Sequence, residues 1–285
     1  MTIVLIVLLA AVLSLLNGSL QDQLRSTFRG HPQRLIALPL LLTTVLAAAS
    51  VWADAFSVAL TLAVLAYTSA PVICAAMLPP KFDLLTVLLL WLPIELAAGA
   101  ALVPKHAQGF LHSVAYGVAI LLGLALFLGY RALPGMKYNL PRRKADFWLP
   151  LAAFAVTAPV LVLVGIPIGF IPTPHLPVQS AGKMAAAVGL IFVGTALPEE
   201  ILFRALIQNL LMRRFGENER TLCAASLIFG AAHLNNGPQA LPNWRYMILA
   251  TIAGYAYGKV FQKASTVLSS AALHMMVDWT KHFFF

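Results

Sequence analysis

Charged residues are scarce in this chain of 285 residues. They make up 10 % of it, whereas hydrophobic residues make up 60 %. In an ordinary soluble domain, roughly 25 % of the residues are charged and 45–50 % are hydrophobic. A water-soluble fold of this length could not bury so much apolar surface, which excludes a soluble enzyme, a disordered protein and a coiled coil. Long polar segments are also lacking, since the longest, Met136 to Asp146, is too short for a core of its own.

Cysteine is nearly absent as well. The two cysteines, Cys74 and Cys223, lie in apolar runs and form no C-x-x-C, which argues against a disulfide scaffold or a thiolate zinc site. The net charge is +9, a value that suggests nucleic-acid binding in a soluble protein. Here the basic residues sit in short loops between apolar runs, as in membrane proteins, and we expect no nucleic-acid partner.

The chain consists instead of a series of apolar runs. Many of these runs approach the length of about 20 apolar residues that a transmembrane helix needs. The sequence therefore predicts an all-α, polytopic integral membrane helix bundle of about ten spans, with eight to ten as the range. We interpret the first run as a retained span and not as a signal peptide. The second and third runs are divided only by Trp52, Ala53 and Asp54, and they predict a tight helical hairpin. The ten runs are 2–17, 34–52, 55–76, 84–103, 112–133, 148–170, 183–211, 221–236, 246–262 and 264–280.

The loop charges support this count. When loops are assigned alternately to two sides, one side receives 14 Lys and Arg and the other receives 4, while Arg204 falls inside a span. The positive-inside rule places the side with 14 in the cytoplasm and both termini outside. We expect a multi-pass protein of a bacterial inner or plasma membrane.

Ionisable residues inside the spans are few and clustered. A charge at the centre of a span costs roughly 2.5–3.5 kcal/mol on insertion scales, so each one needs a reason. Six of the seven occur in the last third of the chain, on three separate spans. The seven are Glu95, Glu199, Glu200, Arg204, His233, His274 and Asp278.

Helical spacing separates the roles of the adjacent acids Glu199 and Glu200. Glu200 and Arg204 are four residues apart with the acid first, which favours an intrahelical ion pair. Glu199 is rotated by about 100° from Glu200, so it need not share that pair. One carboxylate is then neutralised, and its neighbour is left to act as a general base or acid.

The two deep histidines follow the same spacing. Phe229 precedes His233 by four residues, and His274 precedes Asp278 by four. Either Asp278 orients His274, or both point into one cavity with Glu199.

These residues carry a resemblance to a known family. Residues 199–204 match E-E-x-x-x-R, residues 229–233 match F-x-x-x-H, and residues 274–278 match H-x-x-x-N/D. In this order they resemble the CPBP family of CAAX-processing and bacteriocin-processing intramembrane proteases, also called the Abi family. The resemblance covers about residues 183–280. It suggests a catalytic bundle over 148–285 and leaves the spans of 1–147 without a motif.

The resemblance implies an intramembrane endopeptidase. In that family the first Glu and the first His, here Glu199 and His233, activate a water, and the second His and the residue four later, here His274 and Asp278, are thought to stabilise the oxyanion. Glu200 and Arg204 match the supporting ion pair. One departure concerns Asp278, because the prenyl-processing branch resembles H-x-x-x-N. An ionised aspartate cannot donate to an oxyanion, which disfavours a prenylated CAAX substrate and favours an orienting role.

The residues leave metal dependence open. Glu199, His233 and His274 could ligate zinc, yet the chain contains no H-E-x-x-H. We favour a glutamate-activated water that requires no cofactor, with a divalent metal such as zinc as the alternative.

We therefore expect an endopeptidase that cleaves a membrane-associated protein or peptide. A first alternative is a non-proteolytic scaffold or bacteriocin-immunity protein of the same fold. A second is a proton-coupled transporter, in which Glu199 and the histidines would form a relay. No pair of halves with matching broken helices, a feature of many transporters, is evident in the sequence.

Overall fold

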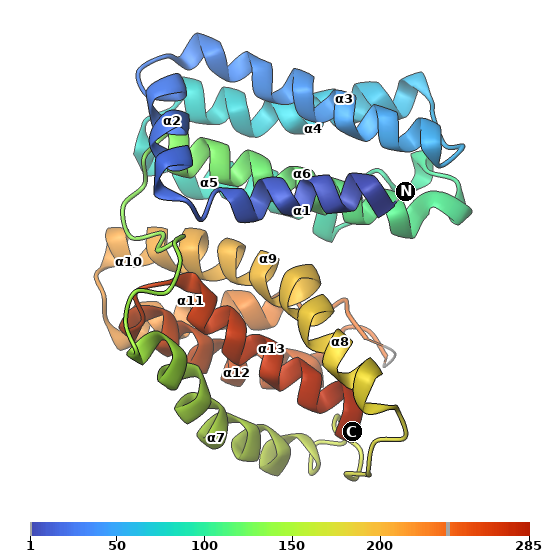
Figure 1. Ribbon diagram of the computed structural model, residues 1–285, viewed down its shortest axis with the longest axis vertical. Coiled ribbons are helices and arrows are strands. Elements are labelled where there is room, and N and C mark those ends of the chain that lie inside the picture. Colours follow the sequence, from blue (N-terminus) through green and yellow to red (C-terminus); the bar gives the residue numbers. More distant parts are fainter. Residues whose placement is uncertain (1, 238–239) are drawn as a thin grey trace. The chain divides into compact units, whose positions relative to one another are not determined.

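The computed structural model describes residues 2–237 and 240–285, and over these residues the chain is helical and contains no β-strand (Figure 1). The predicted all-α class is therefore confirmed. The chain divides into two compact units, Met1–Pro134 and Gly135–Phe285, which we call unit 1 and unit 2. The division by motif placed the boundary at 147/148, and the division of function between the two parts remains a prediction.

Unit 1 is built from helices that run back and forth. The helix that begins as α6 changes its hydrogen-bonding near its end and finishes as the π-helical η5. The predicted hairpin is present as α3 and α4, which pack against each other and are joined by a turn in which Asp54 adopts a positive φ of 49°. The helices are α1 (Thr2–Ser14), α2 (Gly18–Phe28), α3 (Ala37–Trp52), α4 (Val58–Met77), α5 (Asp83–Glu95), α6 (Gln108–Leu124) and η5 (Ala125–Tyr130).

Polar contacts hold the two ends of unit 1. At one end, the guanidinium of Arg131 donates from Nε to Asp83 Oδ1 at 2.9 Å and from Nη2 to the carbonyl of Leu78 at 2.7 Å. These bonds join the end of η5 to the start of α5 and the end of α4. At the other end, the ring of His106 contacts the carbonyl of Ala53 at 3.0 Å. The helices α3, α4, α5 and α6 therefore alternate in direction.

The described part of unit 2, residues 135–237 and 240–285, forms five helical rods. The second is a helix of 35 residues, Ala181–Phe215, which carries two π-helical stretches on either side of a short α-helical segment. The rods are α7 (Ala145–Gly165); the long helix formed by α8 (Ala181–Ile191), η6 (Phe192–Ala196), α9 (Leu197–Glu200), η7 (Ile201–Gln208) and α10 (Asn209–Phe215); α11 (Glu219–Ala231); α12 (Trp244–Lys263); and α13 (Val267–Phe284).

Glycines allow α11 and α12 to approach each other closely. A Cβ atom added at Gly230 would lie 2.0 Å from Thr251 Oγ1 and 2.7 Å from the carbonyl oxygen of Met247. On α12, a Cβ at Gly254 would lie 2.8 Å from Phe229 Cδ1. Small residues at such positions let membrane helices pack backbone to backbone, and this contact fixes where α11 presents its C-terminal end.

The turn between α12 and α13 is tied to the start of unit 2. Lys137 Nζ donates to three backbone carbonyls at the end of α12, those of Phe261, Gln262 and Ala264, at 2.8–3.0 Å. Asp146, at the start of α7, accepts bonds from the backbone N–H and the hydroxyl of Ser265. These contacts set the starting register of α13, which carries His274.

The number of predicted spans is not confirmed. Among the described residues, five helices are long and apolar enough to cross a membrane, or six if α1 and α2, which meet at 91°, form one broken span. Each of the ten predicted runs does contain a helix, but α1, α5 and α11 are each only 13 residues long, and α12 and α13 carry too many polar residues. The five are 32–52, 58–77, 105–130, 145–165 and 181–215.

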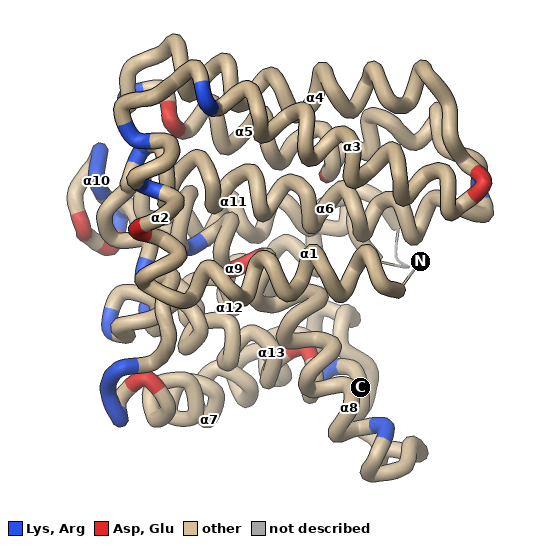
Figure 2. Tube along the Cα trace, turned by 45° about the horizontal axis from the view of Figure 1, so that its top comes forward, with Lys and Arg blue, Asp and Glu red and all other residues tan. Residues whose placement is uncertain are grey.

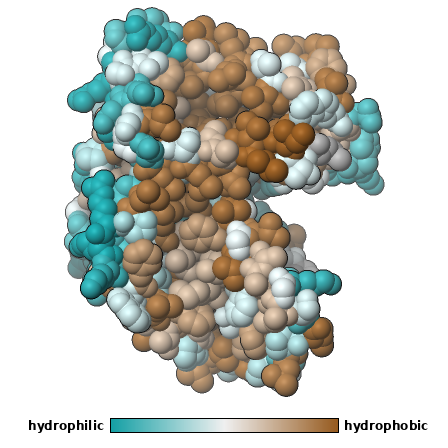
Figure 3. Space-filling model, viewed as in Figure 1, coloured by the Kyte–Doolittle hydropathy of each residue, from teal (hydrophilic) through white to brown (hydrophobic). Residues whose placement is uncertain are grey.

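Charge and hydropathy are arranged along the rods as a bilayer requires. Within each unit, Lys and Arg gather at one end of the helices (Figure 2). Hydrophobic residues cover much of the visible helix surface, and hydrophilic ones gather at helix ends (Figure 3). Exposed aliphatic side chains such as Leu41, Ile73 and Leu163 are suited to contact with lipid.

Candidate active site

The centre of unit 2 contains a buried ion pair. Arg204 Nε donates to Glu200 Oε2 at 3.0 Å, and both side chains are 0 % exposed. The two residues come from successive turns of one helix, in which the π-helical η7 begins directly after Glu200. The ion pair expected from the four-residue spacing is thus present in the structure. π-Helical turns inside α-helices are frequent at functional sites.

Aromatic rings enclose the guanidinium. The Cζ atom of Arg204 lies 4.7 Å from the ring centroid of Phe229 and 5.8 Å from that of Tyr257. The face of an aromatic ring attracts a cation, most strongly where water is excluded. Arg204 is therefore held by one carboxylate and two rings, from three different helices.

His274 is the point at which the sequence motifs meet. Its Nδ1 atom lies 3.1 Å from Glu200 Oε1. Its Nε2 atom lies 3.4 Å from Asp278 Oδ2 and 3.9 Å from Glu199 Oε2. The ring stacks on Tyr257 with a centroid separation of 4.6 Å. The structure therefore brings the acidic pair of the long helix to the histidine of α13.

His233 comes from the end of α11. Its Nδ1 atom lies 2.8 Å from the carbonyl oxygen of Phe229. Because a carbonyl only accepts, this bond assigns the proton to Nδ1 and leaves a lone pair on Nε2 of the neutral ring. Tyr246 packs edge-on against the ring at 4.5 Å. The structure thus explains the motif F-x-x-x-H. The backbone carbonyl of Phe229 accepts the bond from His233, and the ring of Phe229 packs against Arg204.

Two cavities open beside these side chains. The inner cavity, of about 60 Å³, is lined by His233, His274 and Asp278 together with Tyr246 and Tyr257. It is large enough for water, which needs roughly 10–15 Å³ of such space. The outer cavity, of about 610 Å³, is lined by residues of α8, of η6 and of the C-terminal end of α13.

Asp278 and Lys281 line both cavities. Glu199 is among the lining residues of neither, although its carboxylate is 21 % exposed and reaches His274. Of the predicted residues, His233, His274 and Asp278 thus share one cavity, while Glu199 stands at its edge and Glu200 and Arg204 lie behind it.

Sequence reasoning missed several residues of this region. Phe170, Tyr246 and Tyr257 were not singled out, because aromatic residues in apolar runs are ordinary core residues. Lys281 could have been found, since it lies seven residues after His274 and three after Asp278, on the same face of α13.

The described donors do not form a metal site. Across residues 2–237 and 240–285, no group of three His, Cys, Asp or Glu side chains is arranged to hold a metal ion. Both ring nitrogens of His274 face carboxylate oxygens.

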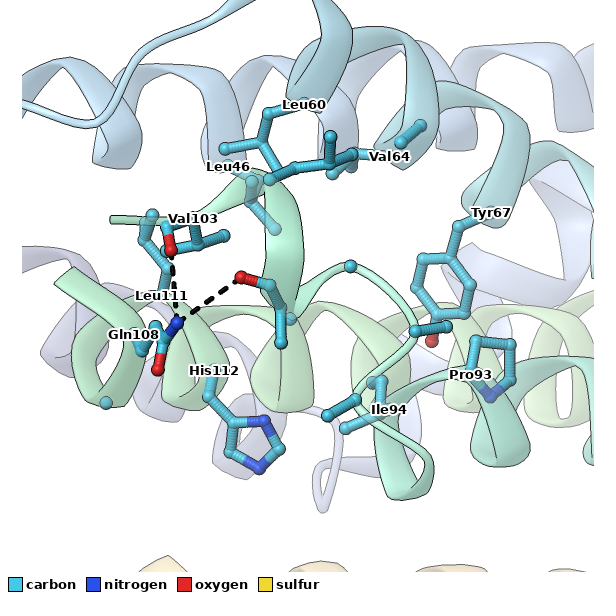
Figure 4. A pocket seen from close by; sticks show the side chains of 18 residues that line it. Leu46, Leu60, Val64, Tyr67, Pro93, Ile94, Val103, Gln108, Leu111 and His112 are labelled. Atoms are coloured by element: carbon cyan, nitrogen blue, oxygen red, sulfur yellow. Dashed lines mark hydrogen bonds between the residues drawn. The ribbon is translucent and has the colours of Figure 1, made fainter. Parts of the chain in front are cut away.

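A different cavity lies in unit 1, where α5 ends early and the following turn leaves space beside α4. It measures about 480 Å³ and is mainly apolar (Figure 4). Its polar groups are largely engaged. Gln108 donates to the carbonyls of Ala100 and Val103 (dashed lines in Figure 4), and the hydroxyl of Tyr67 donates to the backbone carbonyl of Leu90. None of the residues predicted to carry chemistry lines this cavity.

Comparison with known proteins agrees with the sequence motifs. Residues 181–280 match the family model "Type II CAAX prenyl endopeptidase Rce1-like". This segment begins at α8 and contains Glu199, Glu200, Arg204, His233, His274 and Asp278. No curated protein and no solved structure matches the chain.

The match confirms the resemblance to the CPBP proteases. It falls on the prenyl-processing branch, which the sequence disfavours because Asp278 stands where that branch has Asn. Together with the apolar helices, it indicates a multi-pass integral membrane protein. Over residues 181–280, about a third of the chain, the sequence is therefore similar to the Rce1-like type II CAAX prenyl endopeptidases, and this similarity supports a CAAX-type intramembrane endopeptidase in general.

Proposed function

We propose that the protein hydrolyses a peptide bond of a membrane-associated protein or peptide, with a water activated by Glu199 and His233. The observation that carries this proposal is the convergence on His274, where Glu200, Asp278 and Glu199 place carboxylate oxygens at 3.1, 3.4 and 3.9 Å from its ring nitrogens. Such a set of acids and imidazoles at membrane depth is costly unless it serves a function.

Glu199 is the proposed general base. Its carboxylate takes a proton from the water as the water oxygen attacks the scissile carbonyl carbon. The C–N bond then breaks, and the same proton passes to the departing amine, so that the products are a carboxylic acid and an amine. Glu199 suits this role because Arg204 is already bonded to Glu200, and because the Glu199 carboxylate is partly exposed beside the histidines.

His233 is the proposed partner in water activation. Its Nδ1–H is bonded to the carbonyl of Phe229, and the remaining lone pair on Nε2 can accept a hydrogen bond from the water. His233 lines the inner cavity with His274. A water there would lie between a ring that accepts and a ring that donates.

His274 is the proposed oxyanion donor. Its distances from Nε2 to Asp278 and Glu199 exceed a normal N–H···O bond, so a developing oxyanion can compete for this N–H. Asp278 supports this role by orienting the ring, and Glu200 does the same through Nδ1, itself held by Arg204. Oriented donors of this kind contribute roughly 2.7–4 kcal/mol each to acyl-transfer transition states.

We propose no metal in this reaction. The described acids and histidines lack the arrangement that a zinc ion needs, and general-base hydrolysis requires no other cofactor. As partners we propose a membrane-associated peptide or protein and the bilayer, and as location a bacterial inner or plasma membrane.

The test is Glu199→Gln in the full-length protein, purified in detergent and assayed on a cleavable membrane peptide. Loss of a general base lowers kcat by roughly 10²- to 10⁴-fold. The matched control is Glu95→Gln, an acid of unit 1 that accepts a bond from Trp91 Nε1 at 3.2 Å, and this variant should retain activity. Wild-type turnover by Glu199→Gln would exclude Glu199 as the base.

The same variants separate the rival functions. A scaffold or immunity protein would show no cleavage, and Glu199→Gln would still complement a deletion strain. A transporter would move a solute into liposomes without cleaving any peptide. Comparing the protein N-termini of wild-type and Glu199→Gln strains would identify the substrate.

A further inference from the structure

Lys281 occupies a special position in unit 2. His274, Asp278 and Lys281 follow one another at intervals of four and three residues along one face of α13. Lys281 lines the inner cavity together with His233 and His274, and it also lines the outer cavity. Among the described residues that line either cavity, it is the single Lys or Arg.

Two aromatic rings hold the ammonium in place. The Nζ atom of Lys281 lies 4.6 Å from the ring centroid of Phe170 and 4.5 Å from that of Tyr246. The two rings stack on each other at 4.9 Å, and Tyr246 also packs against His233. A flexible lysine side chain is thereby fixed beside the reaction centre, and less entropy is lost when it binds a ligand.

The outer cavity offers such a ligand room to bind. Its walls are mainly apolar, from Ile171, Ala187, Leu190 and Ile191, and its volume of about 610 Å³ is typical of a ligand site. Apolar walls lower the local dielectric, which strengthens charge interactions beside them. A substrate that extends from the outer to the inner cavity must pass the Lys281 ammonium.

We propose that Lys281 forms a carboxylate subsite, which binds an anionic carboxylate of the substrate in the outer cavity and so positions the scissile bond at the inner one. This inference rests on the proposed endopeptidase function. The carboxylate is either the C-terminal group of the substrate or the side chain of an acidic residue, and both present the same chemistry to an ammonium.

The experiment compares matched peptides with purified full-length protein. One pair differs only in a free C-terminal carboxylate or a C-terminal amide, and a second pair differs in Asp or Asn on either side of the cleavage site. We expect wild-type protein to prefer the carboxylate form of one pair by roughly 10- to 100-fold in kcat/KM, mainly through KM. The pair that shows the preference identifies the source of the carboxylate.

The variants connect that preference to Lys281. In Lys281→Met the ratio of kcat/KM within the discriminating pair should fall to about one, while Lys281→Arg should keep most of the preference. The matched control is Lys263→Met, an exposed lysine at the opposite end of unit 2, which should leave the ratio unchanged. A purely structural role for Lys281 would lower the activity on both peptides of a pair equally.

Two results would overturn the proposal: wild-type protein that cleaves both peptides of each pair equally well, or a preference that survives in Lys281→Met. If the protein cleaves no peptide, the proposed function fails. The carboxylate subsite is then tested by peptide binding alone. Dissociation constants of the same peptides for wild type and Lys281→Met would show a carboxylate preference dependent on Lys281 if the subsite exists, and none if it does not.

Discussion

Replacing Arg204 by Met should strongly destabilise unit 2. Arg204 and Glu200 are both fully buried and share one bond of 3.0 Å. Removing one partner of a buried ion pair leaves an uncompensated charge and costs about 3–5 kcal/mol. Since Glu200 keeps His274 as a partner on its other oxygen, we expect a loss near the lower end, about 3 kcal/mol.

Thermal unfolding of the purified protein in detergent measures this loss. For a unit of this size, 1 kcal/mol corresponds to roughly 2–4 °C in Tm, so a fall of roughly 6–12 °C is expected. The double variant Arg204→Met with Glu200→Gln removes both charges and should recover at least half of the fall, because a neutral pair needs no compensation. Arg220→Met, at an exposed arginine, is the control and should change stability by no more than about 0.5 kcal/mol.

The reasoning is refuted if the single variant melts like the wild type, or if the double variant melts no higher than the single one. The first result would mean that the ion pair contributes little. The second would mean that the side-chain packing of Arg204 against Phe229 and Tyr257, and not its charge, is what stabilises the unit.

Two further predictions concern packing and metal. Gly230→Ala should lower the free energy of unfolding by about 1–3 kcal/mol, because the new Cβ would collide with Thr251 Oγ1 and the Met247 carbonyl. Gly189→Ala, where no atom lies within 4 Å, should be neutral or stabilising in the same thermal assay, and equal losses in both would contradict the packing argument. Peptide cleavage should persist after dialysis against a chelator, since the described donors form no metal site; activity that is lost with the chelator and restored by zinc would contradict this expectation.

The sequence by itself determined the all-helical class and the membrane setting, and it selected the candidate site residues, whose catalytic roles remain a prediction. Composition excludes a water-soluble fold whatever the packing, and an ionisable residue in an apolar run is visible without coordinates. The pairing of Glu200 with Arg204 was also predictable, because both residues lie on one helix and helical spacing is local.

Only the tertiary structure decided the rest. The lengths of the rods differ from those of the apolar runs because helix ends depend on turns and caps as well as on hydropathy, as in α5, which stops at Glu95 shortly after Pro93. The contact of His274 with Glu200 joins residues 74 positions apart, and the stacking of Lys281 on Phe170 and Tyr246 joins three separate segments. Such contacts depend on the packing of whole helices, which no local pattern encodes. For that reason only the folded chain shows which rings and cavities surround Lys281, although its spacing from His274 and Asp278 is visible in the sequence.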